Sequence, residues 1–158
     1  NLDSLYKQYM HDVYRYLLSL TGDFFLTEDL LQDTFLKAYL YLDDCREERV
    51  KPWLFRVAYN RYLDHLRKNK RIRLKDNTFF ASAPGSQNTE SYVVLKEEMN
   101  EIMDMIEGLP ERQKQAVLLT DFHSLSYKEA AQTLGIHMNH FKVLLFRGRQ
   151  KIRAQRKE

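Results

Sequence analysis

Two segments in opposite halves of the chain carry the residues best suited to contact a polyanion. Residues 51–75 hold nine basic residues against a single acid, Asp64, and aromatic residues are interleaved with them. Residues 142–157 hold seven basic residues and no acid. The formal net charge of the whole chain is only +3, so its charges are segregated into blocks. This pattern predicts two separate surfaces for nucleic acid, and acidic surfaces elsewhere for another partner.

The first basic segment also predicts an amphipathic helix whose polar side could read bases. Asn60 and Asp64 lie one turn apart and offer hydrogen-bond donors and acceptors rather than charge alone. Trp53 lies among arginines and could stack on an unpaired base, although burial against the preceding helix is the alternative that we favour for this residue alone. The expected core face comprises Phe55, Ala58, Tyr59, Tyr62 and Leu66, and the expected polar face comprises Arg56, Asn60, Arg61, Asp64, Arg67 and Lys68.

The second basic segment belongs to a helix-turn-helix pattern. Ser126 and Glu129 predict a capping box that begins a short helix, and Gly135 lies at the centre of the turn that follows. A second helix from about Asn139 would enter the major groove of DNA, with its early residues at base edges. An ordinary helical hairpin is the alternative, but the cations of this helix favour DNA because phosphate contacts supply most of the affinity. These cations are Lys142, Arg147, Arg149, Lys151 and Arg153.

Hydrophobic periodicity predicts helices in nearly all of the remaining sequence. The first is expected to end near Gly22, with Thr27 as the N-cap of the second. Pro52 fits the first turn of a third helix that runs to about Lys70. Five glycines, three prolines and little β-branched alternation also argue for helices. The fold class that we predict is therefore all-α.

A change of composition divides the chain into two parts. Residues 76–91 are rich in Ser, Asn, Gly and Pro, which indicates a flexible linker. We therefore expect two small helical domains, residues 1–75 and 92–158, with the helix-turn-helix in the second. No apolar run approaches the roughly 18 residues of a membrane-spanning helix.

Four motifs in order resemble the extracytoplasmic-function group of bacterial RNA polymerase sigma factors, and the similarity covers almost the whole chain. They read EDLLQDTF at 28–35, PWLFRVAYN with DHLR at 52–60 and 64–67, LPER at 109–112, and LSYKEAA at 125–131. The resemblance implies a factor that binds core RNA polymerase, recognises a promoter and opens its DNA. It also implies that the chain is not an enzyme and needs no cofactor.

The resemblance assigns a role to each patch. Asp29, Gln32 and Asp33 match the positions that contact the clamp helices of the largest polymerase subunit, and residues at this spacing share a helix face. A solvated acidic face is the alternative. The minus-ten element, as its strands separate, would be contacted by Asn60, Asp64, Arg56, Arg61, Arg67, Lys68 and Trp53. The minus-thirty-five element, as duplex, would be contacted by Asn139, His140, Lys142, Arg147 and Arg149.

The expected recognition helix departs from the pattern of the family. Val143 and Leu144 stand where polar readout groups are usual, so its base preference does not carry over. His137 and His140 have the spacing of a metal pair, but no further ligand is evident, and a surface or capping role is expected.

The resemblance further implies the polymerase flap and an anti-sigma factor as partners. It implies no small-molecule substrate and a cytoplasmic location at the nucleoid or, through the anti-sigma factor, at the membrane. A stand-alone helix-turn-helix regulator is the alternative function, although it leaves the residue 28–35 motif unexplained. A metal-dependent nuclease or phosphotransferase with Glu28, Asp29 and Asp33 as magnesium ligands is a second alternative, but no phosphate loop or general base accompanies them.

Overall fold

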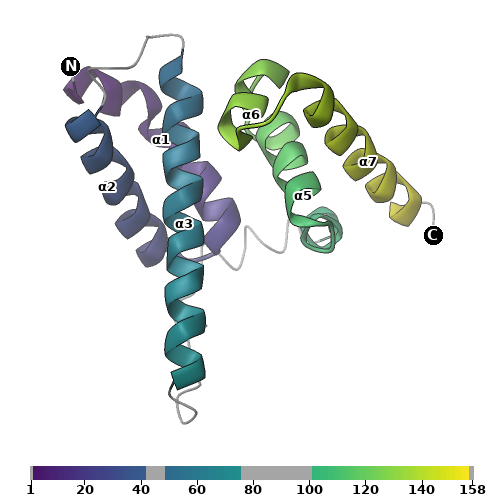
Figure 1. Cartoon of the computed structure of the whole chain (residues 1–158), viewed down its shortest axis with the longest axis horizontal. Helices are drawn as coiled ribbons and strands as arrows, with labels where there is room; N and C mark the ends of the chain where they lie inside the picture. Colours follow the sequence, from purple (N-terminus) through teal and green to yellow (C-terminus); the bar gives the residue numbers. More distant parts are fainter. Residues whose placement is uncertain (1, 42–48, 76–100, 157–158) are drawn as a thin grey trace.

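The computed structural model describes residues 2–41, 49–75 and 101–156, and every regular element in these ranges is helical. The expected linker at 76–91 lies outside the described residues. Figure 1 shows α1, α2 and α3 side by side as one group, and α5, α6 and α7 as a second group beside α3. The all-α prediction is confirmed.

The N-terminal group is a three-helix arrangement of α1 (Leu2–Thr21), α2 (Phe24–Tyr41) and α3 (Val50–Lys75). Its core contains Tyr16 and Phe55, whose ring centroids lie 5.0 Å apart. Helix α3 extends well beyond α1 and α2 (Figure 1). This extension explains why Leu66, which the periodicity placed on the core face, is exposed instead.

The turn between α1 and α2 differs from the expectation. Helix α2 begins at Phe24, and Asp23 caps it by accepting hydrogen bonds from the backbone N–H groups of Phe25 and Leu26. The prediction that Thr27 is the N-cap is therefore wrong. Thr27 lies inside the helix with its hydroxyl buried, 2.7 Å from that of Thr21.

The C-terminal group contains the predicted helix-turn-helix. Residues 101–107 are helical, and α5 (Glu111–Val117) continues as a π-helical turn, η4 (Leu118–Phe122), before α6 (Tyr127–Leu134). The capping box is confirmed, since Ser126 and Glu129 satisfy each other's backbone N–H groups. Gly135 ends α6 in the left-handed conformation at φ 69°, which favours glycine, and so turns the chain into α7 (Met138–Arg156).

Close packing of two helices fixes the position of α7. Phe141, Leu144 and Leu145 are buried against the rest of the group. Gly148 faces α5 so closely that a Cβ there would lie 2.9 Å from the Val117 side chain. The lack of a side chain at this position therefore allows α7 to pack closely on α5. The opposite side of α7 is exposed.

Candidate nucleic-acid and protein interfaces

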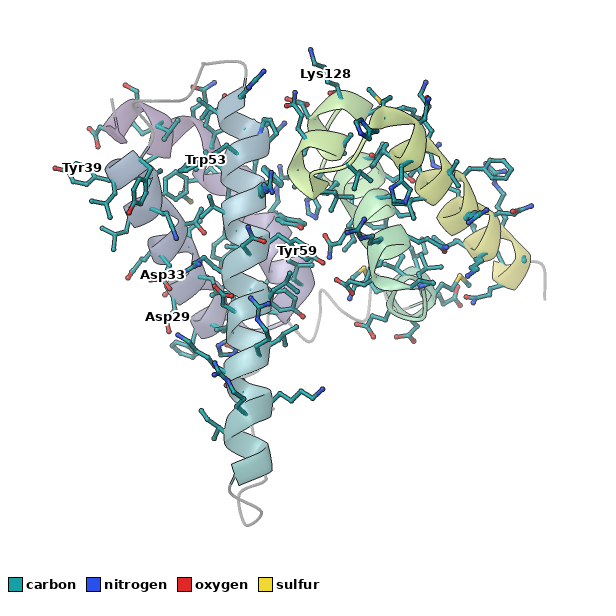
Figure 2. The ribbon with its side chains drawn as sticks, in the orientation of Figure 1. Asp29, Asp33, Tyr39, Trp53, Tyr59 and Lys128 are labelled. Carbon is teal, nitrogen blue, oxygen red and sulfur yellow. The ribbon has the colours of Figure 1, made fainter. Side chains whose placement is uncertain are left out.

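The expected polymerase-binding residues lie on the exposed side of α2. Asp29, Gln32 and Asp33 are all exposed, whereas the intervening residues pack inward. Figure 2 shows Asp29 and Asp33 about one turn apart, projecting from α2 on the side away from the C-terminal helices. The structure therefore brings the three side chains together on one accessible face, where carboxylates could accept paired hydrogen bonds from arginines of a partner.

An apolar surface continues this acidic face along α2, and the sequence analysis missed it. Leu36, Tyr39 and Leu40 are 59%, 66% and 60% exposed. Exposed apolar side chains gathered on one surface commonly mark a protein contact. Their spacing from Asp33, at three to seven residues, is the signal that could have identified them.

On α3, Asn60 is exposed but Asp64 is held by two arginines. Arg61 donates to Asp64 at 2.7 Å, and Arg67 donates to its other carboxylate oxygen. The hydrogen bond from Arg67 is the largest influence lowering the pKa of Asp64. Asp64 therefore stays ionised and orients the two guanidinium groups. Lys68 is exposed beside this cluster.

Two other residues of the expected minus-ten surface pack against other parts of this chain. Trp53 is half-buried and packs against the hydrophobic core, in agreement with the alternative considered for it. Arg56 is exposed, but its guanidinium lies 3.4 Å from the position that a Cβ on Gly135 would take. Arg56 therefore faces the turn of the helix-turn-helix.

Buried hydrogen bonds join the two groups of helices. The Tyr16 hydroxyl donates to Oε1 of Gln115 at 2.6 Å, and both side chains are fully buried. Nearby, Nε2 of His123 lies 3.2 Å from the Ser19 hydroxyl. Burial is the main cause that lowers the pKa of His123 to about 4, with a further contribution from Arg15. His123 is consequently neutral at pH 7.

Two further contacts lie along α3. The Tyr59 hydroxyl donates to Oε1 of Glu111 at 3.1 Å, and Figure 2 shows Tyr59 on the side of α3 that faces the C-terminal group. Burial, followed by the charge of Glu111, raises the pKa of Tyr59. The Thr133 hydroxyl is 3.3 Å from the carbonyl oxygen of Pro52. The interface between the two groups thus includes several polar contacts, as is common between domains of one chain.

The expected duplex-reading residues of α7 are mostly accessible. Asn139, His140, Lys142 and Arg147 are exposed. Arg149 differs, because it forms a bidentate pair with Asp121 at 2.6 and 3.0 Å, and these hydrogen bonds raise the pKa of its guanidinium above the ordinary value. Its charge is therefore partly neutralised before any contact with DNA.

The two apolar residues noted on this helix have different environments. Leu144 is buried in the core and is not available for readout, whereas Val143 is exposed. Phe146, which the sequence analysis did not single out, is also exposed. Within the described ranges, no group of three or more His, Cys, Asp or Glu side chains could hold a metal ion. Nor does any helix in those ranges have the length and apolarity to cross a membrane.

Comparison with protein families identifies two regions in the chain. Residues 5–72 match the model of sigma-70 region 2, and residues 99–152 match that of sigma-70 region 4. The chain is 40% identical to the ECF RNA polymerase sigma factor SigM of Bacillus subtilis, over 97% of this chain and 93% of that protein. It is also 30% identical to RNA polymerase sigma factor SigZ of the same organism, over 97% and 85% of the two chains.

Solved structures share the fold at lower identity. The sigma factor RpoE from Bartonella quintana, determined in complex with the anti-sigma factor NepR, superposes with a TM-score of 0.73 at 20% identity, covering 98% of this chain and 97% of that one. CnrH, determined in complex with the cytosolic domain of CnrY, gives a TM-score of 0.72 at 21% identity, covering 99% and 87%.

Proposed function

The chain belongs to the extracytoplasmic-function group of RNA polymerase sigma factors, and from this we propose how its surfaces divide the work of promoter recognition. Sigma factors bind core RNA polymerase and promoter DNA, so the chain directs transcription initiation. We assign the N-terminal domain, residues 1–75, to the clamp helices and the minus-ten element. The C-terminal domain, residues 92–158, binds the minus-thirty-five element, and residues 76–91 connect the two.

Polymerase binding rests on the acidic face of α2. Asp29, Gln32 and Asp33 are exposed together on one face of α2, where a partner's arginines could reach them. The clamp helices of the largest subunit are the partner that this face fits, and the flap is the second polymerase contact. Their exposure together on one face is the observation that carries this proposal, because a stand-alone DNA-binding regulator has no need of such a face.

Minus-ten recognition rests on the exposed side of α3. Asn60 supplies hydrogen bonds to a base, while Asp64 orients Arg61 and Arg67 toward the strand. Lys68 and Arg56 add phosphate contacts, and the part of the Trp53 ring that the core leaves exposed stacks against a base. Each stacked base is worth about 1–3 kcal/mol, which is enough to trap DNA that opens transiently. The role needs no nucleotide hydrolysis, so the chain acts as a binding subunit and not as an enzyme.

Minus-thirty-five recognition rests on α7. Asn139 and His140 lie at the start of the helix where base edges are reached, and Lys142 and Arg147 reach phosphates. Arg149 joins them if its pair with Asp121 opens on contact with DNA.

Simultaneous binding of both elements requires the two groups of helices to separate. The names of the elements place them about 25 base pairs apart, or roughly 85 Å at 3.4 Å per pair. In this structure Pro52 on α3 contacts Thr133 on α6, and Asn60 lies about 12 Å further along α3. Helices α6 and α7, of 8 and 19 residues, extend about 40 Å in total. The contacts between the two groups must therefore break on the promoter.

We also assign an anti-sigma factor as the regulator, because the relatives RpoE and CnrH were solved with the anti-sigma factor NepR and with the cytosolic domain of CnrY. The protein then acts in the cytoplasm at the nucleoid, or is held at the membrane by that factor. No cofactor or small-molecule substrate takes part.

Charge reversal on α2 tests the proposal. Asp33→Arg is expected to weaken binding to core RNA polymerase by about tenfold or more, measured by co-purification and titration, because it removes a charge pair and adds repulsion. Asp104→Arg, the same charge change at an exposed residue of the C-terminal group, is the matched control. Equal losses in the two variants, or none in Asp33→Arg, contradict the assignment.

A further inference from the structure

Four uncharged side chains form a line along the side of α7 that faces away from its core. Asn139, Val143, Phe146 and Gln150 are exposed, and we call them the neutral strip. At about 100° per residue, Val143 lies nearly opposite the buried residues Phe141 and Gly148. Two members are apolar, and Val143 and Phe146 are 44% and 63% exposed. They make no contribution to the core, so their exposure calls for another explanation.

Basic residues border the neutral strip on both sides. At the same angular spacing, Lys142, Arg149 and Arg153 fall along one border, and Arg147 and Lys151 fall along the other. A helix lying in the major groove has a wall of phosphates on each side and base edges beneath it. The two basic borders fit the walls, and the neutral strip then lies over the bases.

We propose that Val143 and Phe146 read thymine in the minus-thirty-five element by packing against its C5-methyl group. Among the four bases, only thymine presents a methyl group in the major groove, and apolar side chains are its usual contacts. Asn139, one turn before Val143, is a residue type that pairs with adenine. A rise of about 6 Å separates these two positions, which is close to two base pairs. The contacted segment is therefore rich in A·T pairs.

Charge complementarity favours DNA over a protein as the occupant of this strip. A protein docking on the apolar residues would have to accept cations along both borders, whereas duplex DNA neutralises both with its phosphates. The inference rests on the proposed function, because it requires α7 to enter the minus-thirty-five duplex.

The test uses the full chain bound to core polymerase and a duplex library randomised over six base pairs upstream of the minus-ten element. The selected sites are expected to contain thymine on at least one strand at two positions. Replacing each thymine by deoxyuridine removes only the methyl group. Equilibrium affinity should then fall about fourfold per methyl, the value for one buried methyl or methylene group.

Variants identify which side chain contacts which methyl. Val143→Ala should abolish the thymine–uracil difference at one position, and Phe146→Ala should abolish it at the other. Lys142→Ala, the matched control, should weaken both duplexes equally and leave their ratio unchanged. Both apolar residues lie outside the core, so the melting temperature of each variant should stay close to that of the parent.

Three results overturn the inference while the proposed function stands: selected sites without thymine, equal binding of thymine and uracil duplexes, or a thymine–uracil ratio unchanged in both apolar variants. Weaker binding to core polymerase by Val143→Ala or Phe146→Ala, with that ratio unchanged, would instead assign the strip to a protein partner. If the holoenzyme selects no upstream sequence at all, the proposed function fails along with the inference.

Discussion

Replacing Tyr16 by Phe isolates one hydrogen bond that holds the two groups of helices together. The ring of Tyr16 packs on Phe55 and on the edge of His123, at 5.0 and 5.3 Å between centroids, and phenylalanine keeps both contacts. Only the 2.6 Å hydrogen bond to Gln115 is lost. Its acceptor oxygen then remains buried without a donor, at a cost of about 1–3 kcal/mol. The equilibrium should shift toward separated domains by about fivefold to 150-fold.

Energy transfer between dyes on the two domains measures this shift. Cysteines at Lys7 and Gln150, both exposed, carry the dyes after Cys45 is replaced by Ser. Tyr16→Phe should lower the transfer efficiency and, because more molecules are competent to bind, raise the apparent affinity for core polymerase. Adding Gln115→Met to Tyr16→Phe removes the orphaned acceptor and should restore part of the closed population. If Tyr16→Phe leaves both transfer and polymerase affinity unchanged, the reasoning is refuted.

Three further predictions use other features of the structure. The pKa of His123 is lowered to about 4 from 6.5, so the unfolded chain binds the proton more tightly than the folded chain. The free energy of unfolding should therefore fall as the pH drops from about 6.5 to 4, by up to about 3 kcal/mol. His123→Gln should flatten that part of a profile of melting temperature against pH. Gly148→Ala should destabilise the protein by about 1–3 kcal/mol in urea unfolding, since its Cβ would meet Val117 at 2.9 Å, and Val117→Ala in the same chain should relieve the clash. Lys142→Ala should reduce the slope of log affinity against log salt for the upstream duplex by about one, and an unchanged slope would remove Lys142 from the phosphate contacts.

Local features of the fold were predictable from the sequence. The capping box at Ser126 and Glu129 and the turn at Gly135 each depend on residues within a few positions of one another, and the structure confirms them. Thr27 shows how such reasoning fails, because the helix begins one turn earlier, where Asp23 accepts hydrogen bonds from the backbone N–H groups of Phe25 and Leu26. The prediction that Leu66 is buried failed for another reason. Periodicity indicates which side of a helix is apolar, but not where the neighbouring helices end.

Contacts between distant parts of the chain could not be predicted. Tyr16 and Gln115 are 99 residues apart, and nothing in the local pattern of either residue indicates its partner. Gly148 likewise packs against Val117 of α5, and the local pattern around neither residue indicates this contact. The candidate site residues were found through the motifs that carry them, and their individual roles stay predictions.

Run-off transcription on a genomic fragment library shows whether this chain directs initiation at specific promoters. Core polymerase supplemented with this chain should produce transcripts from a limited set of start sites that share two upstream elements, and core polymerase alone should not. Asp33→Arg should abolish these transcripts, whereas Asn60→Ala should retain polymerase binding but yield far fewer of them. If the chain binds DNA but adds no specific transcripts with competent core polymerase, the account of its function is contradicted.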